Sequence, residues 1–482
     1  MYSKFYASTD QILNQLQLKE YVSHWKAHEA YSRLNNLNNY YKSKNTAIMN
    51  RVLENSDINN KIATGYAKYI CDVATGYFVG KENSISYVFD NDAEEFQRIL
   101  KYNDSVAVDK DLALSASIYG YGIEQYYLDG DSEFRFKSID PRNVIVFFDG
   151  SIEENITQVI KYREYDYVDE KGLTREKLII EYYTMDTIYE YVFIDNALYE
   201  EESSEMINIF GDIPFTVYDN PSDMADFEGV ISLIDAIDKS MADTSNNLDY
   251  YSNAYIIFKH CDIPISDDEN DDPGLMLKTT KGFQIPNADG DIYFLEKPKM
   301  QDDAINYATD LEKKIFKFSM VPDLTSTEYL QAQSGVAQLL KLQSLEFLTA
   351  NKEALFRKGL FRRLEIMSNI KNIEGKNIDF TEIEIRFSRN TVTSIDELVD
   401  TAIKLKDIIS KESLLEMIPV IDKDVELERL KAEKEANMIE FELMKQSNNF
   451  FPEEEDEEED EPAVKENMKT ETKNDIKNMK KN

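Results

Sequence analysis

The sequence is poor in residue types on which many enzymes and secreted proteins depend. Its 482 residues include 16 Gly and 11 Pro, whereas average usage would supply roughly 34 and 24. Phosphate-binding loops and tight active-site turns use glycine, so the low count disfavours a large α/β enzyme. The two cysteines, Cys71 and Cys261, are too few for a disulfide framework, and they favour a reducing, cytoplasmic setting.

Long hydrophobic runs and a surplus of basic residues are missing as well. No apolar run approaches the roughly 18 residues that span a bilayer, and the N-terminus has no signal pattern, so we expect no membrane partner. Lys and Arg number 54 against 92 Asp and Glu, which gives a formal net charge of −38. This balance disfavours a sequence-reading nucleic-acid binder and a ligand of anionic membranes. The length suits roughly three domains, and 42% hydrophobic residues supply their cores.

Short motifs that carry catalytic or metal-binding chemistry are incomplete. Between Gly76 and Lys81 the glycines have three spacers instead of the four of a phosphate-binding loop, so entry into a strand is the preferred interpretation. His24 and His28 have the spacing of two zinc ligands but no evident third ligand, which favours a pair on a helix surface. The acidic run 267–272 lacks the glycine and the closing glutamate of a calcium loop. We therefore expect no enzyme, no metal site and no cofactor.

Hydrophobic periodicity divides the chain into helical and β-rich stretches. Alternating apolar and polar residues over 121–218 predict antiparallel strands and hairpins, with turns at Asp149-Gly150 and Lys171-Gly172. A β-rich segment follows at 254–299 and a polar loop at 320–333. Nine consecutive carboxylates at 453–461 have no apolar partner, so we expect a disordered tail. Apolar spacing near three and four predicts helices over 10–41, 59–75, 93–120, 223–251, 302–318, 334–371 and, as two or three pieces, 394–445.

This order of parts resembles the portal protein of tailed bacteriophages, in the branch typical of long-tailed phages of Gram-positive hosts. No one segment is diagnostic, but their order and spacing extend over about residues 10 to 400. The segments that carry the resemblance are Asn59–Lys81, Asp140-Pro-Arg-Asn-Val144 with Asp149, Phe227–Asp238, Val321-Pro-Asp323, Ser334-Gly-Val-Ala337 and Phe356–Arg363.

The resemblance implies an α+β fold of portal type. Its parts are a helical and β wing, a two-helix stem, a small α/β clip, a long kinked tunnel helix and a helical crown. The corresponding ranges are 1–222 for the wing, 223–253 and 301–319 for the stem, 254–300 for the clip, 320–333 for the tunnel loop, 334–393 for the long helix and its return to the wing, 394–450 for the crown, and 451–482 for the acidic tail.

The resemblance also implies site residues. Lys313, Lys314 and Lys317 lie away from the apolar stripe of their helix, and they either face a channel or pair with acids of a neighbouring subunit. The basic group Arg357, Lys358, Arg362 and Arg363 either meets scaffold or capsid carboxylates or forms a solvated helix face. The DNA-facing tunnel loop, whose alternative is a disordered surface loop, would comprise Val321, Pro322, Asp323, Leu324, Thr325, Ser326, Thr327 and Glu328. Clip contacts to terminase or adaptor would be Asp267, Asp268, Asp271, Asp272, Lys278 and Lys281.

The partners implied are those of a DNA conduit. They are identical subunits in a ring of twelve (thirteen is the alternative for isolated rings), the terminase large subunit, a head-completion adaptor, a scaffolding protein, the major capsid protein, and double-stranded DNA without sequence specificity. The place implied is a capsid vertex of the virion, with assembly in the host cytoplasm. An acidic wall agrees with this role, because a basic channel would bind phosphates and retain the duplex.

Two other functions remain open from the sequence alone. Another ring or baseplate component of a phage is disfavoured by the order helix, β segment, helix. A metal-dependent nucleic-acid enzyme would need acids that converge on a cation, and the spacing does not show them.

Overall fold

The computed structural model describes residues 4–9, 11–53, 58–88, 93–169, 171–252, 256–259, 289–294, 301–330, 335–373, 375, 379–390, 403–406, 408–416, 426–434 and 438. Two units divide the chain, residues 1–392 and residues 393–482. In the second unit, the described residues include the short helix α14, Lys411–Glu416, and a helical stretch at 426–434. The remainder of the helices predicted there, and the acidic tail, lie outside the described residues.

The helix predicted over 10–41 is two helices, α1 (Gln15–Ala27) and α2 (Glu29–Tyr41). The break falls at His28, whose backbone is extended and whose ring nitrogen Nδ1 accepts a hydrogen bond from the amide of Ala30 at 3.1 Å. His28 thus caps the start of α2 in the way that Asn or Ser usually does. The pair expected for His24 and His28 is a ring contact, with centroids 5.8 Å apart.

The next helices also differ from their predicted limits. A short helix α3, Thr46–Met49, precedes α4, Tyr66–Val79, which continues through Gly76, where a strand was predicted. Tyr77, Phe78 and Val79 are buried, so packing carries the helix past the glycine. The helix predicted over 93–120 is interrupted near Asp104, which has a left-handed backbone with φ +48. The two pieces are α5, Ala93–Tyr102, and α6, Ser105–Tyr119.

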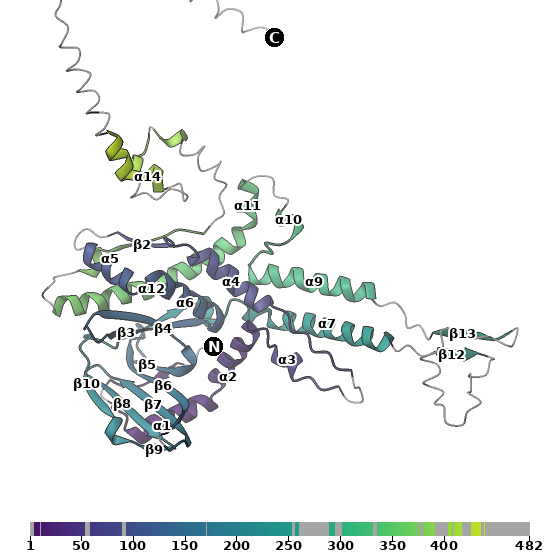
Figure 1. Ribbon diagram of the computed structural model, residues 1–482, viewed down its shortest axis with the longest axis horizontal. Helices are drawn as coiled ribbons and strands as arrows, with labels where there is room; N and C mark the ends of the chain where they lie inside the picture. Colours follow the sequence, from purple (N-terminus) through teal and green to yellow (C-terminus); the bar gives the residue numbers. More distant parts are fainter. Residues whose placement is uncertain are drawn as a thin grey trace, which may run out of the picture. The chain divides into compact units, whose positions relative to one another are not determined.

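The antiparallel strands predicted over 121–218 are confirmed (Figure 1). Glycines with φ near +75 make two of the turns, Gly150 at +72 and Gly172 at +78. One sheet has the order β1-β5-β6-β7-β8-β10 with β9 on β8, and a second has the order β11-β3-β4. The bounds are β1 Phe5–Tyr6, β3 Tyr121–Leu128, β4 Phe134–Ile139, β5 Val144–Phe148, β6 Ile156–Val168, β7 Thr174–Tyr183, β8 Thr187–Ile194, β9 Ala197–Leu198, β10 Ser204–Ile207 and β11 Phe215–Asp219.

One strand pairing was not predicted. The N-terminal β1 pairs in parallel with β5, and Phe5 lies opposite Phe147. Two further strands far apart in sequence, β2 (Ile85–Val88) and β14 (Glu384–Phe387), form an antiparallel pair. They bring the end of the long helical segment back to the N-terminal part of the chain.

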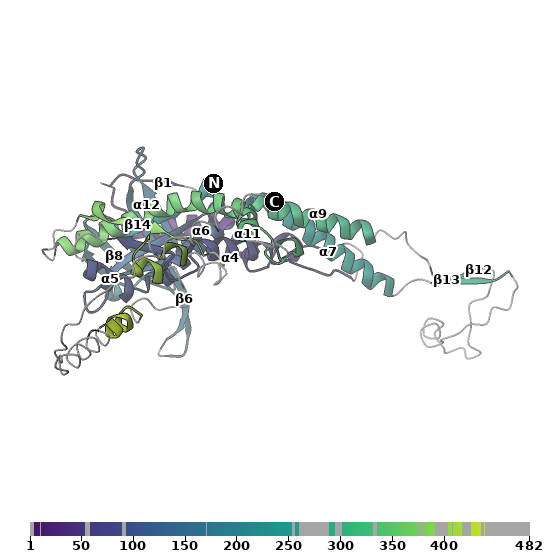
Figure 2. The same cartoon turned by 90° about the horizontal axis from the view of Figure 1, so that it is seen from above.

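Helices make up most of the described residues in the second half of the first unit. α7, Ile231–Ser252, follows two short 3-10 turns, so it begins later than predicted. It leads to the antiparallel strands β12 (Ile256–Lys259) and β13 (Asp291–Phe294), and α9, Gln301–Ser319, runs back along α7 (Figures 1 and 2). A loop with the short helix α10, Thr327–Leu330, follows. The predicted long helix is α11 (Gly335–Lys341) and α12 (Gln343–Ile373), interrupted at Leu342.

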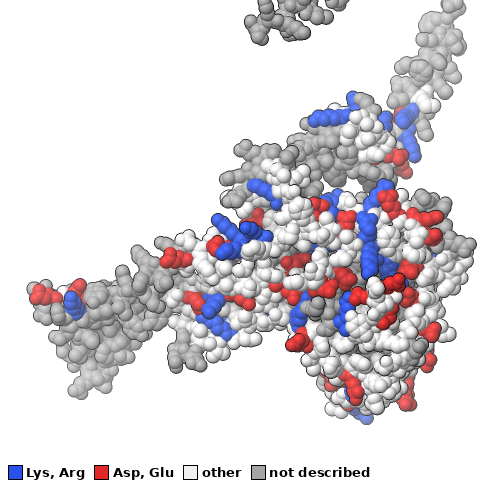
Figure 3. Space-filling model, turned by 180° about the vertical axis from the view of Figure 1, so that it is seen from behind, with Lys and Arg blue, Asp and Glu red and all other residues white. Residues whose placement is uncertain are grey.

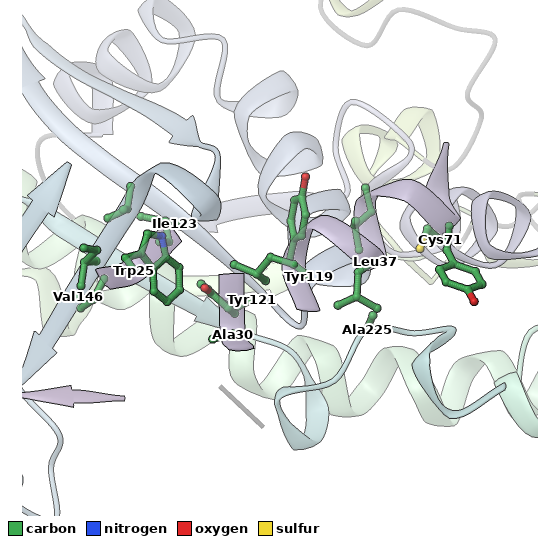
Figure 4. Packing of buried hydrophobic residues seen from close by; sticks show 14 of the residues in the cluster. Trp25, Ala30, Leu37, Cys71, Tyr119, Tyr121, Ile123, Val146 and Ala225 are labelled. Atoms are coloured by element: carbon green, nitrogen blue, oxygen red, sulfur yellow. The ribbon is translucent and has the colours of Figure 1, made fainter. Parts of the chain in front are cut away.

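The main core lies where the N-terminal helices meet the sheets. Trp25, Leu37, Tyr119 and Cys71 come from α1, α2, α6 and α4, and Figure 4 shows them in this region. A second core cluster surrounds α12 and includes Phe78, Phe134 and Phe356. The long helix therefore packs on both α4 and the smaller sheet.

Buried charges fix α12 at two points. Near its middle, the ammonium of Lys352 lies 2.5 Å from a carboxylate oxygen of Asp226 and 2.6 Å from the hydroxyl of Ser117. Farther along, the fully buried guanidinium of Arg363 lies 2.6 Å from Asp109 and 2.8 Å from Glu124. Each pair joins α12 to a residue more than 120 positions away in the sequence.

Replacement of Arg363 by Ala should lower the thermal unfolding midpoint strongly. It would leave Asp109 and Glu124 buried without their cation, a loss that typically costs about 3–5 kcal/mol. The control is Arg386→Ala, because Arg386 and its partner Glu384 are both largely exposed and such pairs contribute about 1 kcal/mol or less. Circular dichroism melts of the two variants measure the difference; equal midpoints would contradict the structural role of Arg363.

Candidate functional site

The paired helices α7 and α9 and the loop after them correspond to the segments that the sequence singled out. Buried Ile234 and Ile237 of α7 face Leu311 and Ile315 of α9, so the core of this pair is the predicted apolar stripe. Phe318 belongs to the predicted stripe as well, but it is 62% exposed. The stripe therefore continues onto the open surface of α9.

A segment from the N-terminal part of the chain lies along another side of α7. We call it the N-terminal strap, residues 40–53 and 58–64. Asp235 accepts hydrogen bonds from the hydroxyl of Tyr40 at 2.6 Å and the amide of Asn45 at 2.9 Å. Asp238, which is wholly buried, accepts from Asn45 at 2.7 Å and from Thr64, whose hydroxyl lies at 2.6 Å. The carboxylates of Asp235 and Asp238 are thus hydrogen-bonded by donors within the chain.

The same side of α7 has partners at its two ends. At the start, the guanidinium of Arg33 on α2 holds both oxygens of Glu228, at 2.7 and 2.5 Å. Toward the other end, Arg51 pairs with Asp243, and the side-chain oxygen of Asn246 accepts from the amide of Asn60 at 2.7 Å. Sequence periodicity did not reveal this surface, because hydrophobic spacing does not register a helix face covered by polar partners.

The three lysines singled out on α9 are all exposed. Lys314 pairs with Asp310 one turn earlier, at 2.6 Å, while Lys313 and Lys317 lie on the same open part of the helix. Acidic and basic side chains alternate over the face shown in Figure 3. This face is therefore mixed in charge in spite of the acidic total.

The loop after α9 begins with an abrupt change of direction. Met320 has a left-handed backbone, with φ +62, and Val321 is fully buried. The carboxylate of Asp323 accepts hydrogen bonds from the amide and hydroxyl of Thr325, at 2.9 and 2.7 Å. This turn leads into α10.

Three tyrosines on α4 hold this region together. Tyr66 donates to Glu312 of α9 at 2.9 Å, and Tyr77 donates to Glu346 of α12 at 2.9 Å. Between them, the hydroxyl of Tyr69 contacts the backbone of the loop. Burial together with its carboxylate partner raises the pKa of Tyr77 to about 12, so its hydroxyl remains a donor at neutral pH. The spacing of these tyrosines was visible in the sequence, but their polar partners were not.

The family model described as "Phage portal protein, SPP1 Gp6-like" matches residues 21–440. The chain belongs to the phage portal protein family. This match confirms the resemblance drawn from the sequence and, with it, a portal-vertex function in a phage particle.

A relative and a solved structure accompany the match. The portal protein of Clostridium phage phiCD119 is 21% identical over 429 residues, which cover 82% of this chain and 91% of the relative. The structure "Neck of empty GTA particle computed with C6 symmetry" aligns at 11% identity with a TM-score of 0.39, over 73% of this chain and 88% of that one. At this level of similarity, no property of that structure is assigned to this chain.

In this portal-family chain the four basic residues expected to act together on α12 do not all reach the surface. Arg363 lies in the interior with Asp109 and Glu124, so it cannot meet a scaffold or capsid protein. Arg362 pairs with Asp212 at 2.6 Å, and Arg357 donates to the carbonyl oxygen of Ile385 at 2.6 Å. The prediction is therefore wrong for Arg363, whose acidic partners are distant in sequence. Lys358 is exposed, and a contact of Arg357, Lys358 and Arg362 with a scaffold or capsid protein stays a prediction.

Several predicted sites lie outside the described residues. These are the clip residues Asp267, Asp268, Asp271, Asp272, Lys278 and Lys281, together with Cys261. Among the residues that the structure describes, His, Cys, Asp and Glu side chains nowhere gather in threes as a metal site requires. None of the described helices is both long and apolar enough to cross a membrane.

Replacement of Asp219, at the end of β11, should alter the pH dependence of stability. Burial, with the nearby charge of Asp223, raises the pKa of Asp219 from 3.8 to about 6, although Lys358 and Lys4 oppose the shift. The folded chain therefore binds this proton more tightly than the unfolded chain, and stability falls as pH rises from about 4 to about 6.

Asp219→Asn removes the loss of stability that deprotonation of Asp219 causes. Its thermal midpoint should exceed that of the parent by a few degrees at pH 7.5, and the difference should vanish near pH 4. The control is Glu82→Gln, which removes an exposed carboxylate. A constant difference across the pH range would contradict the role of Asp219.

Proposed function

We propose that this chain forms a ring through which double-stranded DNA enters and leaves a phage capsid. In this assignment α7 and α9 are the stem and β12 with β13 belongs to the clip. The loop containing α10 is the tunnel loop, α11 with α12 is the long kinked helix, and residues 1–222 with β14 form the wing. The second unit corresponds to the crown.

The family match over residues 21–440 supports this proposal most directly. The order of elements agrees with it. Two packed antiparallel helices are joined at their far ends by a β pair, and a short anchored loop connects them to a long helix. The role is structural: the ring guides DNA, while the terminase large subunit performs the work of packaging.

The charge of the candidate lumen suits a duplex that must slide. The loop from Met320 to Leu330 contains no Lys or Arg, so it offers phosphates no cation to bind. The exposed Lys313 and Lys317 would form belts of positive charge in a ring, which attract the backbone weakly from one side. Contacts of this kind hold DNA without reading its sequence.

The partners that follow from this assignment act at different parts of the ring. The clip would meet the terminase large subunit during packaging and a head-completion adaptor afterwards. The wing and crown would meet scaffolding protein and major capsid protein while the particle assembles in the host cytoplasm. A ring of twelve subunits in the virion, or thirteen in isolation, completes the proposal.

Negative-stain microscopy of the purified chain tests the ring directly. We expect particles with a central hole and cyclic symmetry, because a head-to-tail interface that closes produces such a ring. Monomers without a hole at every protein and salt concentration would overturn the proposal.

Alanine at Lys313, Lys314 and Lys317 together tests the lumen. In a packaging assay with the cognate terminase, the triple variant should form rings, and its rate of DNA entry should depend less on salt between roughly 50 and 200 mM. The reason is that fewer counterions are exchanged as the duplex passes. The matched control is alanine at the exposed Lys101, Lys110 and Lys137. Loss of ring formation would instead assign the three lysines to contacts between subunits.

A further inference from the structure

The hydroxyl of Tyr69 lies between two backbone groups of the loop that follows α9. It donates a hydrogen bond to the carbonyl oxygen of Pro322 at 3.2 Å and accepts one from the amide of Leu324 at 2.8 Å. A phenol can act as donor and acceptor at once. One side chain of α4 therefore holds the loop on both sides of Asp323.

Asp323 in turn organises the exposed part of the loop. Its side chain accepts from the amide and hydroxyl of Thr325, and its carbonyl oxygen accepts from the hydroxyl of Ser326 at 3.0 Å. The amide of Tyr329 donates to the carbonyl oxygen of Ser326 at 3.0 Å. These bonds join the turn to α10 as one local unit, so the orientation of α10 depends on where Asp323 is held.

Met320 and Val321 fix the start of this unit. Val321 is fully buried in the main core, and Met320 makes the reversal of direction from α9 with its left-handed backbone. Thr325 and Thr327 are exposed. Between buried Val321 and the exposed threonines, the hydroxyl of Tyr69 links the loop to α4.

The neighbouring Tyr66 packs like Tyr69 but has a different hydrogen-bond partner. The rings of Tyr66 and Tyr69 both meet Phe316 edge to face, with centroids 5.8 and 5.6 Å away. The hydroxyl of Tyr66, however, donates to the side chain of Glu312 on α9 and not to the loop. The two residues therefore share an aromatic packing role but not a hydrogen-bonding role.

We propose that Tyr69 is a positioning residue for the tunnel loop: its hydroxyl holds Asp323, and with it α10, at a defined place on α4. This inference rests on the proposed function, in which the loop faces DNA. The loop offers no cation to the phosphates, so its position and shape affect how it meets a duplex. The bond from Tyr69 therefore bears on whether packaged DNA is retained.

Hydrogen exchange of assembled rings tests the positioning itself. Tyr69→Phe keeps the ring on Phe316 and removes both bonds to the loop. Exchange in peptides covering 320–326 should accelerate about fivefold or more, the factor expected for loss of an ordinary hydrogen bond. Tyr66→Phe should leave exchange in these peptides unchanged. Equal exchange in the parent and both variants would overturn the proposal.

Retention of DNA in filled particles tests the consequence. Particles built with Tyr69→Phe should keep their DNA at least twofold less often than particles with the parent chain or with Tyr66→Phe. Faster exchange with unchanged retention would overturn the link between loop position and DNA. If particles with the parent chain never filled, the proposed conduit itself would fail, whereas the exchange result would still decide the role of Tyr69.

Discussion

A buried ion pair, Lys352 with Asp226, lies where the main parts of the first unit meet. Its lysine comes from α12, and its aspartate from the turn that leads into α7. The hydroxyl of Ser117 on α6 contacts the same ammonium, and the carbonyl oxygen of Ser117 accepts from the amide of Asp226 at 2.9 Å. Both charged side chains are almost completely removed from solvent. Loss of either partner would leave an unpaired charge in the interior. The direction of α7 and the position of α12 are therefore set together.

The tyrosines of α4 extend this constraint to α9, to the loop after it and to α12. One helix contacts α9 through Tyr66, the loop through Tyr69 and α12 through Tyr77. A change in any of these three elements must therefore be accommodated at α4. Glycine at position 76 does not interrupt the helix, because neighbouring side chains are anchored in the two core clusters.

The sequence allowed the order of the elements to be predicted, because strand alternation and helix spacing are local signals. The break at His28 and the exact place of the break at Asp104 were not predicted, because the capping nitrogen of His28 and the left-handed backbone of Asp104 depend on atoms that periodicity does not describe. The prediction that Arg363 lies on the surface was wrong for a different reason. The partners of Arg363, Asp109 and Glu124, lie 254 and 239 positions away in the sequence. Only the fold reveals that this arginine is an interior residue.

The N-terminal strap has a consequence for how relatives of this chain diverge. Its pairs with α7 join Tyr40 to Asp235, Arg51 to Asp243 and Asn60 to Asp249, at separations of 195, 192 and 189 residues. From Tyr40 to Asn60 the strap follows the direction of the helix, and it then turns back, because Thr64 pairs with Asp238. A donor lost on one side leaves an acid unsatisfied on the other. Substitutions at these positions should therefore occur in matched pairs, even among relatives as distant as 21% identity.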